Sequence, residues 1–80
     1  MEIDIARDVL KAAFRSSGEL QSLLGTLKDR CEPDQYTVYA RGVAAAIDAI
    51  GAGLINKVLA TYPELSREID ASIAKHGRYI

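Results

Sequence analysis

The sequence predicts an all-α fold, and three observations support this prediction. Alanine supplies 12 of the 80 residues and aromatic residues only 6%, a balance that favours helices over strands. Apolar residues recur every three or four positions along most of the chain, and the only two prolines, Pro33 and Pro63, mark the breaks. We therefore expect residues 1–80 to form one domain, a small antiparallel helical bundle of three to four helices with one long central helix, completed by dimerisation.

The first helical segment covers about Asp4–Phe14, and a second covers about Ser17–Arg30. In each segment the apolar residues share one face, while charged or polar residues cover the other. The inward residues of the first segment are Ala6, Val9, Leu10, Ala13 and Phe14, and those of the second are Leu20, Leu23, Leu24 and Leu27.

The junction between these segments has two interpretations. Ser16 and Glu19 fit a capping box that would start a new helix. Alternatively, the mostly apolar row from Ile3 to Cys31 keeps its alternating steps of three and four without a slip. A loop would not need to preserve that phase, so the row favours one continuous helix, in which Gly18 costs only about 1 kcal/mol.

A long central helix is expected from Pro33 to about Thr61. Proline disfavours helix at the residue before it and is accepted in a first turn, so Glu32-Pro33 separates this helix from the previous one. Such a helix has roughly 28 residues and is roughly 40 Å long. Its main apolar stripe comprises Tyr36, Ala40, Val43, Ile47, Ile50, Leu54 and Val58.

A short final helix follows Pro63. Thr61 and Glu64 fit a capping box at its start, and Tyr62 as the cap with Pro63 in the first turn is the alternative. Gly77 is placed to end the helix in the left-handed conformation. The residues expected to face inward are Leu65, Ile69, Ser72 and Ile73.

Small residues at the centre of the long helix predict an interface between two copies of the chain. The stripe steps by four, three and four residues and consists of Gly42, Ala46, Ala49 and Gly53. The long helix contains three glycines, at positions 42, 51 and 53. Together they cost roughly 3 kcal/mol of helix stability relative to alanine, and close approach of another helix is the usual compensation. The alternative is that the chain's own first helix packs against this stripe.

A basic ridge runs along the first helix and is a candidate binding site for phosphate or an acidic partner. Arg7, Lys11 and Arg15 lie four residues apart, so they follow one side of the helix. Asp4 and Asp8 are interleaved and can pair with Arg7 and Lys11 three residues on. An ordinary solvated face is the alternative interpretation.

The same ridge carries the alternative function, a dimeric nucleic-acid-binding regulator. A helix-turn-helix can be placed on Leu10–Asp29, but the exposed face of its second helix has only one lysine and one glutamate. Nucleic acid is therefore not the expected partner. The net charge of −1 likewise provides no broad field for nucleic acid or anionic lipid.

Two further candidates lie on the long helix. Tyr36 and Tyr39 could line a small pocket with Arg41 at its rim, or could simply cover the end of the bundle. Asp48 is the only charged residue between Arg41 and Lys57, which suggests either an inter-subunit contact or an exposed polar stripe.

The remaining features argue against catalysis. Cys31 is the only cysteine and His76 the only histidine, so no disulfide forms within the chain and no zinc site is expected. No phosphate loop, dinucleotide motif or nucleophile elbow occurs, so neither a cofactor nor an enzyme activity is expected. The N-terminal residues lack a secretory pattern, and Gly42–Ala60 is too rich in alanine and glycine to be a good membrane span. We expect a cytoplasmic, non-catalytic interaction or assembly module that acts as a homodimer and could also bind another protein.

Overall fold

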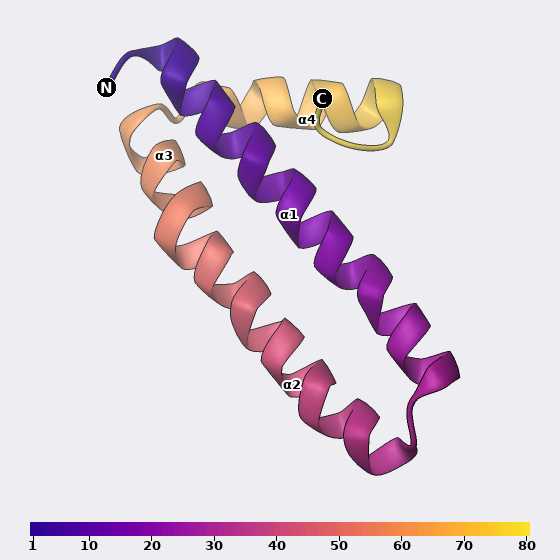
Figure 1. Ribbon diagram of the computed structural model, residues 1–80. Coiled ribbons are helices and arrows are strands. Elements are labelled where there is room, and N and C mark those ends of the chain that lie inside the picture. Colours follow the sequence, from indigo (N-terminus) through magenta and orange to yellow (C-terminus); the bar gives the residue numbers. More distant parts are fainter.

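The computed structural model describes all 80 residues and confirms the all-α fold. Its elements are α1 (Ile3–Arg30), α2 (Pro33–Ile50), a π-helical turn η1 (Gly51–Ile55), α3 (Asn56–Thr61) and α4 (Leu65–His76). The three middle elements form one uninterrupted helix, Pro33–Thr61, which we call the second long helix. Figure 1 shows that α1 and the second long helix run side by side in opposite directions, and that α4 crosses the end at which the chain begins.

Residues Ile3–Arg30 form one helix, so the continuous interpretation is confirmed and the capping box at Ser16 and Glu19 does not form. The helix ends where the amide of Cys31 donates to the carbonyl oxygen of Leu27. Glu32 is extended before Pro33, which occupies the first turn of α2 as expected for proline.

The π-helical turn corrects the predicted apolar stripe of the second long helix. A π turn bonds residues five apart instead of four, so the positions after Gly51 are displaced around the helix axis. As a result Ile55 packs against the core, whereas Leu54, which the α-helical spacing placed inside, is 44% exposed. Val58 is buried as predicted. Helical spacing assumes a constant twist, and the Gly51-Ala52-Gly53 sequence is where this helix departs from it.

The start of α4 also differs from the prediction, while its end agrees. Thr61 does not cap the helix, because its hydroxyl donates to the carbonyl oxygen of Lys57 one turn earlier. The backbone carbonyl of Tyr62 instead accepts the amide of Leu65. Gly77 is left-handed, with a φ of 77°, and ends α4 as predicted.

After Gly77 the chain turns back beneath α4. The hydroxyl of Ser72 donates to the carbonyl oxygen of Arg78 and accepts the amide of Ile80. This return carries Tyr79 into the interior, where its ring meets Phe14 edge-on at a centroid distance of 5.6 Å. The reversal therefore adds an aromatic side chain to a core that otherwise consists of small and aliphatic residues.

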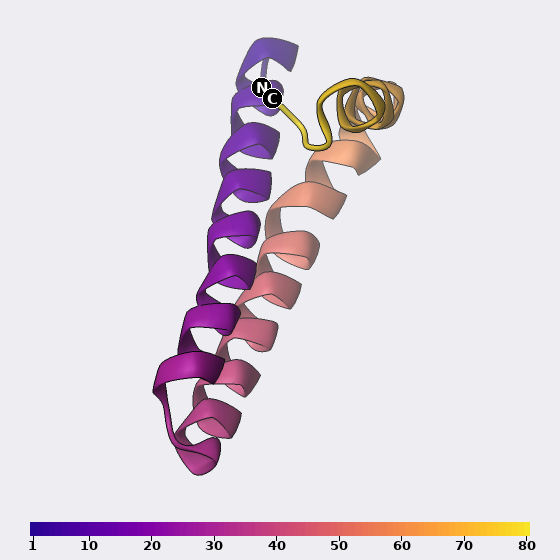
Figure 2. The ribbon, with the colours of Figure 1, turned by 90° about the vertical axis from the view of Figure 1, so that its right-hand side faces the viewer.

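The main core is confined to the end of the molecule that α4 covers. It joins α1, α3, α4 and the returning chain, and its members are Ala6, Leu10, Val58, Leu65, Ile69 and Tyr79. Beyond α4 the structure is only two helices thick (Figure 2). The molecule measures 44 × 26 × 15 Å, and its radius of gyration is 14.7 Å, against about 11.6 Å for a compact domain of this length.

Candidate functional site

One side of the helix pair carries no charge and is not covered by the chain. Helical spacing places its residues on the side opposite α4, because α4 and the returning chain lie over the side that contains Phe14 and Ile47. We call this side the uncharged face, and it comprises Ile5, Val9, Ser16, Leu20, Leu23 and Leu27 of α1 with Tyr39, Gly42, Ala46, Ala49 and Leu54 of the second long helix.

Large apolar side chains on the uncharged face remain in contact with solvent. The exposed fractions are 51% for Ile5, 42% for Leu23, 58% for Tyr39 and 44% for Leu54. These are half of the eight large hydrophobic residues that the chain exposes. Their gathering on one uncharged surface distinguishes this face from the scattered apolar exposure that is normal for a monomer.

The small-residue stripe lies on or beside this face and has no helix packed on it. Gly42, Ala49 and Gly53 are exposed, and Ala46 is half-buried. A Cβ atom added at Gly42 or Gly53 would meet nothing within 4 Å. The first helix therefore does not fill the stripe, which was the alternative to an interface. The π turn moves Gly53 toward the outer side of the helix, and Leu54 continues the row.

The accessible surface of the chain is large for its mass. It amounts to 5768 Å², whereas a compact monomer of 8.7 kDa exposes about 4,700 Å². The excess of about 1,000 Å² is similar to the roughly 800 Å² that each partner covers in a standard stable interface. Covering one side of the helix pair would bring the exposure per chain back to the ordinary range.

The opposite side of the helix pair contains a groove. It lies in the angle between α1, the second long helix and α4, and has a volume of about 1170 Å³. Apolar side chains from all three helices line it, with Phe14, Ile47, Ile55 and Ile73 among them. Lys11, Arg15 and Arg78 lie on the same groove.

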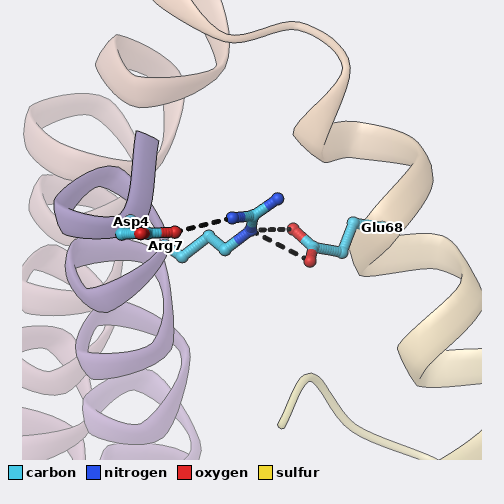
Figure 3. A network of polar contacts seen from close by, with 3 residues as sticks. All are labelled: Asp4, Arg7 and Glu68. Carbon is cyan, nitrogen blue, oxygen red and sulfur yellow. Dashed lines mark hydrogen bonds and ion pairs between the residues drawn. The ribbon is translucent and has the colours of Figure 1, made fainter. Parts of the chain in front are cut away.

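The predicted basic ridge is thus divided between two environments. Arg7 is held by the chain itself, because its Nε lies 3.0 Å from one carboxylate oxygen of Glu68 and its terminal nitrogen 2.9 Å from Asp4 (Figure 3). The hydrogen bond and charge of Glu68, followed by those of Asp4, raise the pKa of Arg7. The predicted pairing of Asp4 with Arg7 is confirmed, whereas that of Asp8 with Lys11 does not form. Only Lys11 and Arg15 of the ridge face the groove.

Tyr79 lies beside this ion pair and is a buried ionisable residue that the sequence analysis did not single out. Its ring is buried and its hydroxyl has no hydrogen-bond partner. Burial, and to a smaller extent the negative charge of Glu68, raise the pKa of Tyr79. The sequence feature that could have indicated its burial is its place two residues after Gly77. A glycine that ends a helix lets the chain reverse, so an aromatic residue just beyond it can pack back against that helix.

The other candidates do not form a common site. Tyr36 is half-buried, while Tyr39 and Arg41 are exposed at the far end of the helix pair, and none of the three lines a pocket. Asp48 is exposed and makes no ion pair within the chain, which agrees with an exposed polar position. Cys31 is a half-buried thiol at the end of α1.

The second long helix, Pro33–Thr61, is long and apolar enough to cross a membrane by length and composition. Only 11% of its most apolar window is buried within the chain. A single helix of this kind is weak support for a membrane span, because the core helix of a soluble protein passes the same criterion.

Protein-family models, curated proteins and solved structures show no match to the chain, so its function is inferred from its own residues and their geometry.

Proposed function

We propose that the protein is a non-catalytic assembly module, which forms a homodimer through the uncharged face. The observation that carries this proposal is the coincidence, on one side of the helix pair, of exposed Leu23 and Leu54, a stripe of small residues and no charge. Such a surface suits an apolar partner with the same properties, and a second copy provides one.

In this dimer two helix pairs pack face to face around a two-fold axis and give a core of four long helices. The small side chains of Gly42, Ala46 and Ala49 let the second long helices approach closely. Leu23 and Leu54, at larger radius, fill the space beside the crossing. The half of each chain that is two helices thick then gains the third and fourth helices that an apolar core requires.

The uncharged face also favours a second copy over a partner chosen by charge. Charged residues at an interface set specificity by matching opposite charges. A surface without charges cannot select a partner by charge. Complementary shape and apolar area are enough for a two-fold contact between identical patches. The excess surface of about 1,000 Å² per chain is enough for an interface of standard size.

Two matched substitutions test the proposal. Ala49 and Ala44 are both exposed on α2, but they lie five residues apart and therefore on different sides of the helix, with only Ala49 on the uncharged face. Ala49→Glu buries a carboxylate in the dimer, whereas Ala44→Glu makes the same chemical change in solvent. Light scattering after size-exclusion chromatography should give twice 8.7 kDa for the unaltered chain and for Ala44→Glu, and 8.7 kDa for Ala49→Glu.

Circular dichroism should show the same helix content in all three proteins, because both positions are exposed in the single chain. A monomeric unaltered chain at every concentration would overturn the proposal, as would a dimer that tolerates Ala49→Glu. Flotation with neutral phosphatidylcholine vesicles separates the membrane alternative. If the unaltered chain floats with the vesicles and Ala49→Glu does not, the face covers lipid and the dimer proposal is wrong.

A further inference from the structure

The groove beneath α4 combines an apolar floor with a basic rim. Phe14 of α1, Ile47 of α2 and Ile73 of α4 come from three helices and line the same space of about 1170 Å³. Phe14 and Ile47 are only partly buried and Ile73 is 42% exposed, so apolar surface is available within the groove.

The charges around the groove are mostly positive. Lys11 and Arg15 come from α1, and Arg78 comes from the returning chain after Gly77. Glu19 is the only carboxylate residue among the lining side chains. None of the three cations forms an ion pair within the chain, in contrast to Arg7. Their charges are therefore free to meet negative charge on a partner.

The shape of the groove suits a helix better than a small molecule. It is open to solvent along one side, whereas small-ligand sites enclose most of their ligand. The groove residues of α1 run from Lys11 to Ser22, a length of about 16 Å along the helix axis, which corresponds to about eleven residues of a helix laid beside it. Gly18 and Gly51 lie on the walls of the groove, and a Cβ at either position would meet nothing within 4 Å, so a partner backbone can approach closely.

We infer that the groove binds an acidic amphipathic helix of another protein. The apolar stripe of that helix lies on Phe14, Ile47 and Ile73, and its carboxylates pair with Lys11, Arg15 and Arg78. A nucleic acid would meet the same cations, but its backbone offers nothing to cover the apolar floor between them. The groove and the uncharged face lie on opposite sides of the helix pair, so this inference does not depend on the homodimer.

Three labelled peptides of about fourteen residues test the inference by fluorescence anisotropy. All carry leucine at the same helical spacing, and their remaining positions are glutamate, glutamine or lysine. The expected order of affinity is glutamate, then glutamine, then lysine. Added salt should weaken the glutamate peptide most, because part of its affinity is electrostatic. Absence of binding by the glutamate peptide, or equal affinity for all three, overturns the inference.

Arg15→Glu and Arg41→Glu form a matched pair, since each reverses one exposed arginine and only Arg15 lines the groove. Arg15→Glu should weaken the glutamate peptide by about tenfold or more. Arg41→Glu should change its affinity by less than about twofold. Equal losses of peptide affinity in the two variants would show that the peptide binds outside the groove. Light scattering of both variants reports the homodimer separately, so failure of the groove and failure of the dimer are distinguishable.

A short random-sequence DNA duplex serves as the competing ligand. It should bind the unaltered chain weakly and should not displace the glutamate peptide. If the duplex binds tightly and Arg15→Glu abolishes that binding, the basic groove is a nucleic-acid site and the inference of an acidic helix is wrong.

Discussion

Replacing Gly42 by alanine separates a property of the single helix from a property of the dimer. Within one chain the new methyl group meets nothing within 4 Å, and residue 42 lies inside α2. Alanine is more favourable than glycine in a helix interior by about 0.8–1.0 kcal/mol. In a single chain, Gly42→Ala should therefore raise the free energy of unfolding by about 1 kcal/mol. For a domain of this size that corresponds to an increase in Tm of about 4–8 °C.

In the dimer the same methyl group lies where the two second long helices approach. Overpacking of a close contact costs about 1–3 kcal/mol, which cancels or reverses the gain from helix propensity. At low protein concentration Gly42→Ala should thus have a higher Tm than the unaltered chain. At high concentration this difference in Tm should become smaller or negative. Gly25→Ala is the control, because Gly25 is equally open but lies outside the uncharged face.

Thermal unfolding followed by circular dichroism over a wide range of concentrations measures both variants. Gly25→Ala should be more stable than the unaltered chain at every concentration. If Gly42→Ala shows the same constant gain, no helix approaches residue 42 and the close-packed dimer is refuted. If neither variant gains stability at low concentration, the assumption that these glycines are open within one chain is wrong.

Three further predictions concern the core beneath α4. Leu65→Ala removes a side chain that is 1% exposed and should lower the free energy of unfolding by about 2–5 kcal/mol, measured by urea denaturation. Ile73→Ala, at a position 42% exposed, should cost far less, and similar costs would contradict the location of the core. Tyr79→Phe removes a buried hydroxyl without a partner and should leave stability unchanged or raise it by about 1 kcal/mol. Because burial raises the pKa of Tyr79, stability should fall as pH rises above the ordinary tyrosine value, where the unfolded phenol ionises first and the folded one keeps its proton. Alkaline unfolding curves should show a smaller fall for Tyr79→Phe, and identical curves would mean that this group does not contribute.

The local pattern of the sequence determined the helices and most of their limits. Pro33 can start a helix but disfavours one before it, and Gly77 can adopt the left-handed conformation that stops one. The mostly apolar row from Ile3 to Cys31 keeps its phase without a slip, and it favoured one helix across Gly18 because phase is a property of the sequence alone. The pairing of Asp4 with Arg7 followed for the same reason, since residues three apart are neighbours on any helix.

Only the tertiary structure decided which faces are used and which are left open. The π turn at Gly51 moved Leu54 outward, and no spacing rule anticipates a local change of twist. The partner of Arg7 in α4, Glu68, lies 61 residues away, so the division of the basic ridge depends on how α4 crosses α1. The groove brings Arg15 and Arg78 together in the same way. Side-chain spacing fixes what lies on one helix, and it was enough to predict the small-residue stripe. The packing of three helices fixes which side chains of different helices meet, and that is why the groove and the full extent of the uncharged face became visible only in the folded chain.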